Sequence, residues 1–440
     1  MDAPKVKIIK LLVIVMLVFA GSLKAADTLT WNDCVSQTIK NNPTLKAAAA
    51  QVVQTKAQGW SYFASALPQV SAYATGQRNG DDLITQTEIN GINLTSIGTS
   101  HTDSFSYGLT AKQLIFDGFS TLHLMLSAAE SSKAAEENYK TSSASVRLAL
   151  VQAFAGLLAA QDLVKIDTDI ANLRKSQLND ITLLYQSGRE DKGNYMHTEA
   201  SYEQALYSKH QAIRGLELSK AQLCFVMGMD EKQDITVTGD FSISSDINNE
   251  PDYDALAENN PSMKSLTAQK NSADYTAKAA LGNFLPSVYI TGSAGREDDV
   301  WVPQADRVWS VGVTASMPIF EGGALVAKAI QTHAAYDQAV ANEMAGKEQI
   351  LQSLMQTWKS LVDAKQNVTV QKALLDSETE RAKIADIEYQ EGIMTFDDWT
   401  VIQDSYTGSK TSYLNAETNL LTAEAAWIQA KGGTLEDEKK

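Results

Sequence analysis

Residues 119–187 read FSTLHLMLSAAESSKAAEENYKTSSASVRLALVQAFAGLLAAQDLVKIDTDIANLRKSQLNDITLLYQS, and their periodicity sets the architecture. An apolar, small or aromatic residue recurs at every seventh position: Leu150, Leu157, Val164, Ala171, Leu178 and Tyr185. A sustained heptad repeat without proline predicts a long helix that packs along partner helices as in a coiled coil. At about 1.5 Å per residue, this helix would be roughly 100 Å long, so we expect an elongated molecule.

A second stretch of the same kind, residues 323–391, follows at an offset of 204 positions. Ile-Phe-Asp-Gly (115–118) precedes the first stretch and Ile-Phe-Glu-Gly (319–322) the second, while Tyr-Gln-x-Gly ends them at 185–188 and 389–392. The second heptad series is Leu354, Leu361, Val368, Leu375, Ala382 and Tyr389. We therefore predict two related repeats, residues 26–228 and 251–431, joined by a polar irregular linker, residues 229–250.

The N-terminus of the 440-residue chain has the pattern of an export signal. Three lysines precede the apolar run Leu11–Ala20, and Leu23-Lys24-Ala25 offers a small-residue cleavage site. We assign residues 1–25 to the signal peptide. We expect that no later segment is apolar enough for a membrane helix and that any membrane span is a β-strand.

The formal net charge is −16, and it becomes −19 without residues 1–25, which contain four lysines and one aspartate. An acidic surface of this kind opposes binding to nucleic acid. The chain has two cysteines, Cys34 and Cys224, which are too few for a disulfide-based scaffold. A disulfide between them and two buried free thiols are both compatible with the sequence.

Each repeat also predicts a β-hairpin, at about residues 67–118 and 285–322. Leu67-Pro68 and Leu285-Pro286 would each end a helix and start a strand. The offset between the repeats is 218 at these points and 204 further on, so the first hairpin is 14 residues longer. We expect the additional residues to form a loop around Arg78 to Thr102, which is rich in Gly, Asn, Ser and Thr.

Strict alternation of apolar and small polar residues marks the strands, for example over residues 105–112 and 309–317. This pattern fits a strand between lipid and water, and it fits a half-buried soluble hairpin equally well. The export signal favours the membrane. Four strands cannot close a barrel and open edges are not viable in lipid, so the chain must then oligomerise. Two copies would give eight strands and three would give twelve.

The remaining segments read as shorter helices, over residues 28–41, 43–66, 194–228 and 395–431. Asn42-Pro43 and Asn260-Pro261 each combine an N-cap residue with proline at the first helical position. We expect the tail, residues 432–440, to be disordered.

These motifs, in this order, resemble the outer-membrane efflux protein family, the TolC-like channels. The resemblance rests on the two Asn-Asn-Pro starts, the two Leu-Pro strand entries, the corner at residues 317–323 and the two Tyr-Gln-x-Gly turns. It implies a mainly α fold with a membrane β part, built from a duplicated helix–hairpin–long helix–helix unit. It also implies a homotrimer with a twelve-stranded β-barrel in outer-membrane lipid, continued by a twelve-helix coiled-coil α-barrel in the periplasm.

The resemblance further implies a passive exit duct of a tripartite efflux or type I secretion system. Its partners would be a periplasmic adaptor protein and an inner-membrane pump of the RND or ABC type. The transported substrate stays open, as does the choice between drug or metal efflux and protein secretion. A periplasmic coiled-coil adaptor or structural protein with soluble hairpins is the alternative; we do not find the lipoyl-like segments usual in adaptors.

In this family the narrow periplasmic end carries acidic rings and tethers between helices, just after each Tyr-x-x-Gly turn. Asp398 falls on a ring position, and Val401 stands where the family has a second acidic residue, a place that Asp397 could fill. Asn194 stands where the family often has aspartate, and Asp191 lies beside it. The candidate pore-entrance residues are therefore Asp398, Asp397, Asn194 and Asp191.

Three copies of Asp398 at a constriction would attract cations and repel anions. A local interpretation is also open, because Thr395-x-x-Asp398 reads as a capping box. Adaptor contact is proposed for four residues at the two turns: Gly188, Arg189, Gly392 and Ile393.

We predict neither a cofactor nor an enzymatic activity. The five histidines lack metal-ligand spacing, and no phosphate-binding loop or nucleophile motif occurs.

Overall fold

The protein is described from a computed structural model, which covers residues 27–89, 91–229, 234–243, 245, 247, 249–301 and 307–439. The predicted signal peptide, residues 1–25, lies outside the described residues. The chain forms two compact units. We call Ala47–Lys140 with Ala255–Ile350 the sheet unit, and Met1–Lys46 with Thr141–Asp254 and Leu351–Lys440 the helical unit.

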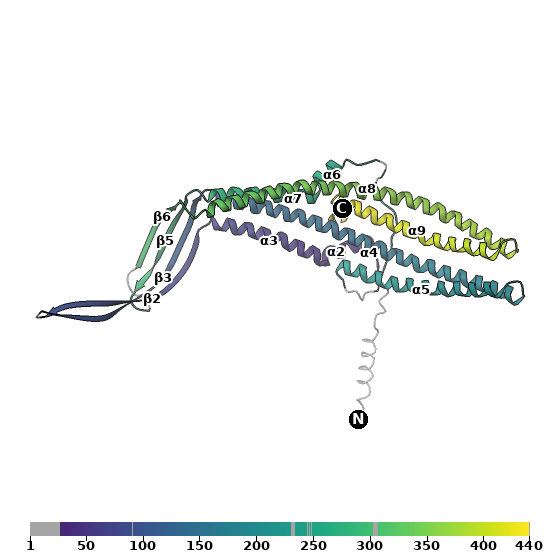
Figure 1. Ribbon diagram of the computed structural model, residues 1–440, viewed down its shortest axis with the longest axis horizontal. Helices are drawn as coiled ribbons and strands as arrows, with labels where there is room; N and C mark the ends of the chain where they lie inside the picture. The colour runs from purple at the N-terminus through teal and green to yellow at the C-terminus, as the bar shows by residue number, and fades with distance from the viewer. Residues whose placement is uncertain are drawn as a thin grey trace, which may run out of the picture. The chain divides into compact units, whose positions relative to one another are not determined.

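The sheet unit contains one antiparallel sheet with the strand order β2-β3-β5-β6 (Figure 1). Its strands are β2 (Gln69–Ile89), β3 (Ile92–Asp117), β5 (Ser287–Asp298) and β6 (Arg307–Ser316). Because the order leaves β2 and β6 at the edges, each has an unpaired side within the chain. Along β6 the residues of both faces are exposed, including Trp309, Val311 and Val313. A lone chain therefore leaves much apolar strand surface uncovered.

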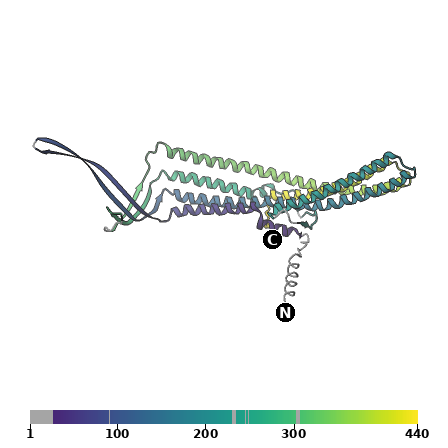
Figure 2. The same ribbon diagram turned by 90° about the horizontal axis from the view of Figure 1, so that it is seen from below.

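The predicted loop around Arg78 to Thr102 is wrong, because these residues continue the two strands. Cross-strand pairing runs from Arg78↔Asp103 to Ile89↔Ile92, so the hairpin is a long two-stranded ribbon (Figure 2). The Arg78 guanidinium contacts the Asp103 carboxylate at 2.5 and 2.7 Å across the strands. Asn90-Gly91 is the sequence pair that tight hairpin turns favour, and Gly91 has a φ of 79°.

The sheet unit also contains most of α3 (Pro43–Ser65), α7 (Pro261–Gly282) and the first parts of α4 (Ser120–Gln186) and α8 (Ala324–Gln390). The predicted starts at Asn-Pro are confirmed. Asn42 Oδ1 accepts hydrogen bonds from the backbone N–H groups of Thr44 and Leu45, at 2.9 and 3.1 Å. Asn260 Oδ1 accepts one from Ser262 at 2.8 Å. Between α4 and α7, Ser127 and Ser131 share hydroxyl hydrogen bonds with Ser272.

Both long helices continue without interruption into the helical unit, and each starts and ends one residue inside its predicted range. There α4 pairs with α5 (Lys192–Met227), and α8 pairs with α9 (Phe396–Ala430) (Figure 1). The heptad residues Leu150, Leu157, Leu354 and Leu361 are fully buried, which is the packing that their spacing predicts. Trp358 of α8 and Trp427 of α9 lie with ring centroids 5.2 Å apart.

The predicted helix at residues 28–41 begins later, because its first residues form a strand. Strand β1 (Asp27–Leu29) pairs in parallel with β4 (Ile235–Val237), and α2 (Trp31–Asn41) follows a capping box made by Thr30 and Asp33. Strand β4 also corrects the expectation that residues 229–250 are wholly irregular. Ile235 and Val237 are buried, and the Gln161 side chain bonds both backbone groups of Val237 at 3.0 Å. A short helix, α6 (Tyr253–Asn259), leads to α7.

The expectation of a disordered tail at residues 432–440 is also wrong for its described part. Glu436–Lys439 form a short 3-10 helix, η1. The Leu435 side chain just before it is fully buried in a core that includes Leu150, Leu157 and Leu223. Burial of the Leu435 side chain in this core fixes the position of the tail.

One helix differs from the expectation that no later segment is apolar enough to cross a membrane. A stretch of α4 is long and apolar enough to cross a membrane, and 61% of that stretch is buried inside the protein. This burial is what the core helix of a packed bundle shows.

Candidate functional site at the helix reversals

Two tight reversals join the long helices to their return helices, and glycine makes both of them possible. Gly188 has a φ of 73° and Gly392 a φ of 78°. In the first reversal, Gly188 donates to the carbonyl of Tyr185 and Arg189 to that of Leu184, at 3.0 and 2.9 Å. Gly392 and Ile393 repeat this pattern with Tyr389 and Glu388. Such paired bonds end a helix with a residue in the left-handed conformation, which glycine adopts at the lowest steric cost.

Each return helix starts with a capped N-terminus. Asp191 caps α5 by accepting a hydrogen bond from Asn194 N at 2.9 Å. Thr395 caps α9, since its hydroxyl accepts from Asp398 N at 3.2 Å and donates to the Asp398 carboxylate at 2.7 Å. The predicted cap at Thr395 is therefore confirmed, with the Asp398 carboxylate bonded to the Thr395 hydroxyl.

The predicted pore-entrance residues all lie in or beside the first turns of these return helices. Asp191, Asp397 and Asp398 are exposed. Asn194 is half-buried and donates a hydrogen bond from Nδ2 to Glu190 Oε1 at 2.8 Å. Three exposed carboxylates thus occupy helix N-termini, where the helix dipole favours them. Their role as a ring stays a prediction, because a ring needs further copies of the chain.

The four residues predicted for adaptor contact lie on the outside of the two reversals. Gly188, Arg189, Gly392 and Ile393 are all exposed, and 70% of the Ile393 surface is accessible. An exposed isoleucine at a tight turn offers apolar surface to another molecule. The contact itself stays a prediction.

Tyr389 ties the second long helix to the first reversal. Its hydroxyl donates to Glu190 Oε2 at 2.5 Å, and its ring stacks on Trp399 with centroids 4.7 Å apart. Burial, the bond to Glu190 and nearby carboxylates raise the pKa of Tyr389 well above its ordinary value. Tyr389 therefore stays a neutral donor at neutral pH.

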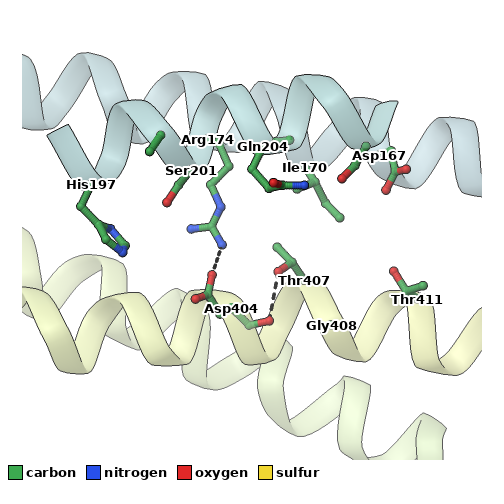
Figure 3. Close-up of a pocket in the computed structure, with 13 residues that line it drawn as sticks. Asp167, Ile170, Arg174, His197, Ser201, Gln204, Asp404, Thr407, Gly408 and Thr411 are labelled. Carbon is green, nitrogen blue, oxygen red and sulfur yellow. Dashed lines mark hydrogen bonds and ion pairs between the residues drawn. The ribbon is translucent and has the colours of Figure 1, made fainter. Parts of the chain in front are cut away.

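A second tie joins α4 to α9 (Figure 3). Arg174 is 6% exposed; it donates to Gln177 Oε1 at 3.0 Å and to Asp404 Oδ1 at 2.5 Å. The pair lines a cleft of about 510 Å³ between α4, α5 and α9. Burial raises the pKa of Asp167, another residue of this cleft.

A third polar group connects α8 to α9. Asp386 Oδ1 accepts hydrogen bonds from Trp399 Nε1 and Gln403 Nε2, both at 2.8 Å. Burial raises the pKa of the Asp386 carboxyl, and the charge of Asp180 acts in the same direction. The first turns of α9 are thus held on one side by α8 and on the other by α4.

The sequence interpretation missed these ties, although one signal was present. Ala171 is at the first core position of its heptad. Arg174, three residues later, is therefore at the second core position. A charged residue at such a position needs a specific partner. The Tyr-Gln-x-Gly motif drew attention to Tyr389 without indicating its hydrogen bond to Glu190.

The structure holds Cys34 and Cys224 as two buried thiols with no disulfide between them. Burial, with the charges of Asp33 and Cys224, raises the pKa of Cys34 to about 12. The two thiols belong to the core between α2, α4 and α5. Among the described residues, no group of three or more His, Cys, Asp or Glu side chains is arranged to hold a metal ion.

Comparison with known proteins agrees with this geometry. The sequence profile described as "Outer membrane efflux protein" matches residues 34–229 and 253–433, which is most of the chain. The chain belongs to this family. The outer membrane efflux protein BepC of Brucella suis is 23% identical over 275 residues, spanning 61% of this chain and 59% of that relative.

Solved channel structures share the fold of this family member. The CmeC outer membrane channel of Campylobacter jejuni has a TM-score of 0.77 and 20% identity, covering 92% of this chain and 86% of that one. The open state of the MtrE outer membrane channel of Neisseria gonorrhoeae has a TM-score of 0.79 and 16% identity, covering 92% and 90%. Both neighbours are described as outer membrane channels. The family match supports the outer-membrane channel interpretation and not the soluble adaptor alternative.

Proposed function

We propose that the protein is the outer-membrane channel of a tripartite efflux or type I secretion system in a Gram-negative envelope. The observation that carries this proposal is a four-stranded sheet with two unpaired edges and exposed apolar strand residues, from which two 67-residue helices continue. Family membership and the fold shared with solved channels support it.

The unpaired edges of β2 and β6 favour assembly of several chains. In a homotrimer, β6 of each chain would pair with β2 of the next, giving a closed barrel of twelve strands in outer-membrane lipid. The order helix, two strands, long helix, return helix occurs twice in the chain. This recurrence supports a duplicated unit, and three chains would supply the twelve-helix α-barrel, which we place in the periplasm.

The helix reversals would form the gated periplasmic entrance. In this proposal Asp398 lines the closed entrance, with Asp397, Asn194 and Asp191 around it. The hydrogen bond from Tyr389 to Glu190 and the ion pair of Arg174 with Asp404 hold the return helices in the closed position. Gly188, Arg189, Gly392 and Ile393 would receive the adaptor, which links the channel to an inner-membrane pump.

Single-channel recording in planar bilayers tests the entrance role with two matched variants. Asp398→Asn removes the charge and leaves the Thr395 cap, whereas Thr395→Ala removes the cap oxygen and leaves the charge. We expect Asp398→Asn to lower cation selectivity and divalent-cation block, and Thr395→Ala to leave both close to wild type. Unchanged selectivity and block in Asp398→Asn would remove Asp398 from the pore lining.

Membrane extraction tests the location independently. A barrel protein should stay in the membrane fraction after salt and carbonate washes and should require detergent for release. Release by carbonate alone would favour the soluble adaptor and contradict the channel.

A further inference from the structure

The segment that follows α9 turns back into the helical unit instead of leaving it. Gly432 has a φ of 84° and donates to the Gln429 carbonyl at 2.9 Å, while Gly433 donates to the Ile428 carbonyl at 2.9 Å. These two bonds close the end of α9 and direct the next residues, 434–439, across neighbouring helices. We call residues 434–439 the strap.

The strap begins with an apolar anchor. Leu435 is fully buried in the core that α2, α4 and α5 share. Its backbone N–H donates to Ser143 Oγ of α4 at 3.1 Å, and the Ser143 hydroxyl donates to Glu436 Oε2 at 2.5 Å. Thr434 N donates to Asp437 Oδ2 at 2.9 Å, which fixes the turn around the anchor.

The strap ends with a charged anchor. Arg147 of α4 is 6% exposed, and its Nε and Nη2 both reach Glu438 Oε1, at 2.7 and 2.5 Å. The other carboxylate oxygen, Oε2, accepts from Trp31 Nε1 of α2 at 3.1 Å. A single side chain thus joins α2 and α4 to the end of α9. A buried guanidinium that loses its carboxylate is strongly unfavourable, so the strap has a specific seat.

We propose that the strap is a fixed anchor for α9, and that this anchor biases the proposed entrance toward its closed state. The inference rests on the proposed function, because it concerns the regulation of that entrance. Helix α9 starts at Phe396, after the Thr395 cap, and ends at Ala430, four residues before the strap. Near its start, Trp399 and Gln403 bond Asp386 of α8. A helix is stiff along its axis, so rotation or displacement of its first turns must be taken up at its last turns.

Charges around the end of α9 are arranged to hold it. Lys431 caps the helix and lies 5.1 Å from the centroid of the Trp427 ring. Burial lowers the pKa of Lys431, while the carboxylate of Glu424 opposes this effect and Arg147 adds to it. Glu424 accepts a hydrogen bond from Ser245 N at 2.7 Å. Glu438 is the carboxylate that contacts Arg147 directly, so losing its charge removes the ion pair between the strap and α4.

The test measures opening in purified, reconstituted full-length channels. Glu438→Gln keeps the size and the acceptor for Trp31 and removes the charge that faces Arg147. We expect the open fraction in single-channel recordings to rise by at least about tenfold over wild type. Glu380→Gln is the matched control, because Glu380 and Lys383 form an exposed pair within α8; its open fraction should equal that of wild type.

A second measurement separates anchoring from general stability. Hydrogen exchange should become faster both in the strap and in the first turns of α9 of Glu438→Gln. Faster exchange confined to the strap, with an unchanged open fraction, would show that the strap only stabilises the fold and would overturn the inference. In that outcome the wild-type channel still conducts, so the proposed function stands. Absence of any conductance from wild-type protein would instead contradict the proposed function.

Discussion

Replacing Asp404 by asparagine should make the proposed entrance open more often. In the structure, Asp404 Oδ1 lies 2.5 Å from Arg174 Nη2, and this ion pair joins α4 to α9. The change keeps the size of the side chain and removes its charge. Arg174 would then keep only the bond to Gln177 among its described partners.

The solvent exposure of Arg174 and Asp404 determines how much free energy the loss of their ion pair costs. Removing one member of a buried pair costs about 3–5 kcal/mol, whereas an exposed pair contributes about 0–1 kcal/mol. The Arg174 side chain is 7% exposed but that of Asp404 is 67% exposed. Water therefore solvates the carboxylate in both states, and about 1 kcal/mol per chain is the appropriate value. Three chains would lose about 3 kcal/mol, which is roughly a hundredfold change in the ratio of closed to open channels.

Single-channel recording of Asp404→Asn gives this ratio, with the Glu380→Gln variant as control. The thermal midpoint of the detergent-solubilised protein should fall only slightly, because the pair is largely solvated on one side. An open fraction equal to wild type would refute the view that the ion pair holds the entrance closed. A large loss of stability without a change in opening would show that Arg174 and Asp404 act only in packing.

Three further outcomes follow from contacts in the helical unit. Asn42→Ala should lower the free energy of unfolding by about 1–2 kcal/mol, because Asn42 Oδ1 caps α3 and its Nδ2 donates to the Val226 carbonyl at 2.8 Å. Chemical denaturation measures this free energy, and an unchanged denaturation midpoint would contradict the prediction. Tyr389→Phe should cost about 1–2 kcal/mol, because it removes the Tyr389 hydroxyl that donates to Glu190 Oε2, and it should raise the open fraction. Equal opening in wild type and variant would exclude the tie. Since burial raises the pKa of Asp386 above its ordinary value of 3.8, its contribution to stability is full below that value and is lost as pH rises through the folded-state pKa. The thermal midpoint of wild type, measured relative to that of Asp386→Asn, should therefore decrease as the pH rises above 3.8, and parallel midpoints at all pH values would reject this.

Local patterns were sufficient to predict the long helices. Their heptads, the proline-free sequence and Gly188 and Gly392 at the reversals all act within a few residues, and the helices Ser120–Gln186 and Ala324–Gln390 start and end within one residue of expectation. The strand entries after Leu67-Pro68 and Leu285-Pro286 follow from equally local preferences. The candidate acidic residues came instead from the resemblance to the efflux protein family, which places acidic rings just after each turn.

The missed features all depend on partners far along the chain. Glu438 is 291 residues from Arg147, and nothing in the sequence of the polar tail indicates that Glu438 pairs with a buried arginine. The three-residue strands β1 and β4 are too short for a periodic signal. The residues from Arg78 to Thr102 looked like a loop because their composition is polar, and cross-strand pairing decided otherwise.

The longer first hairpin has a consequence for how such a sheet can vary. Gln69 and Ser287 are the first residues of β2 and β5, and their pairing partners are Lys112 and Ser316. The first hairpin thus has 14 residues more than the second between these pairs, which is an even number. When the same number of residues is added to both strands at the tip of a ribbon, every side chain in the rest of the sheet keeps its face. An odd total would shift one strand by one residue and move its side chains to the opposite face. The length of this ribbon can therefore change two residues at a time without disturbing the alternation of apolar and small polar residues in the strands beneath it.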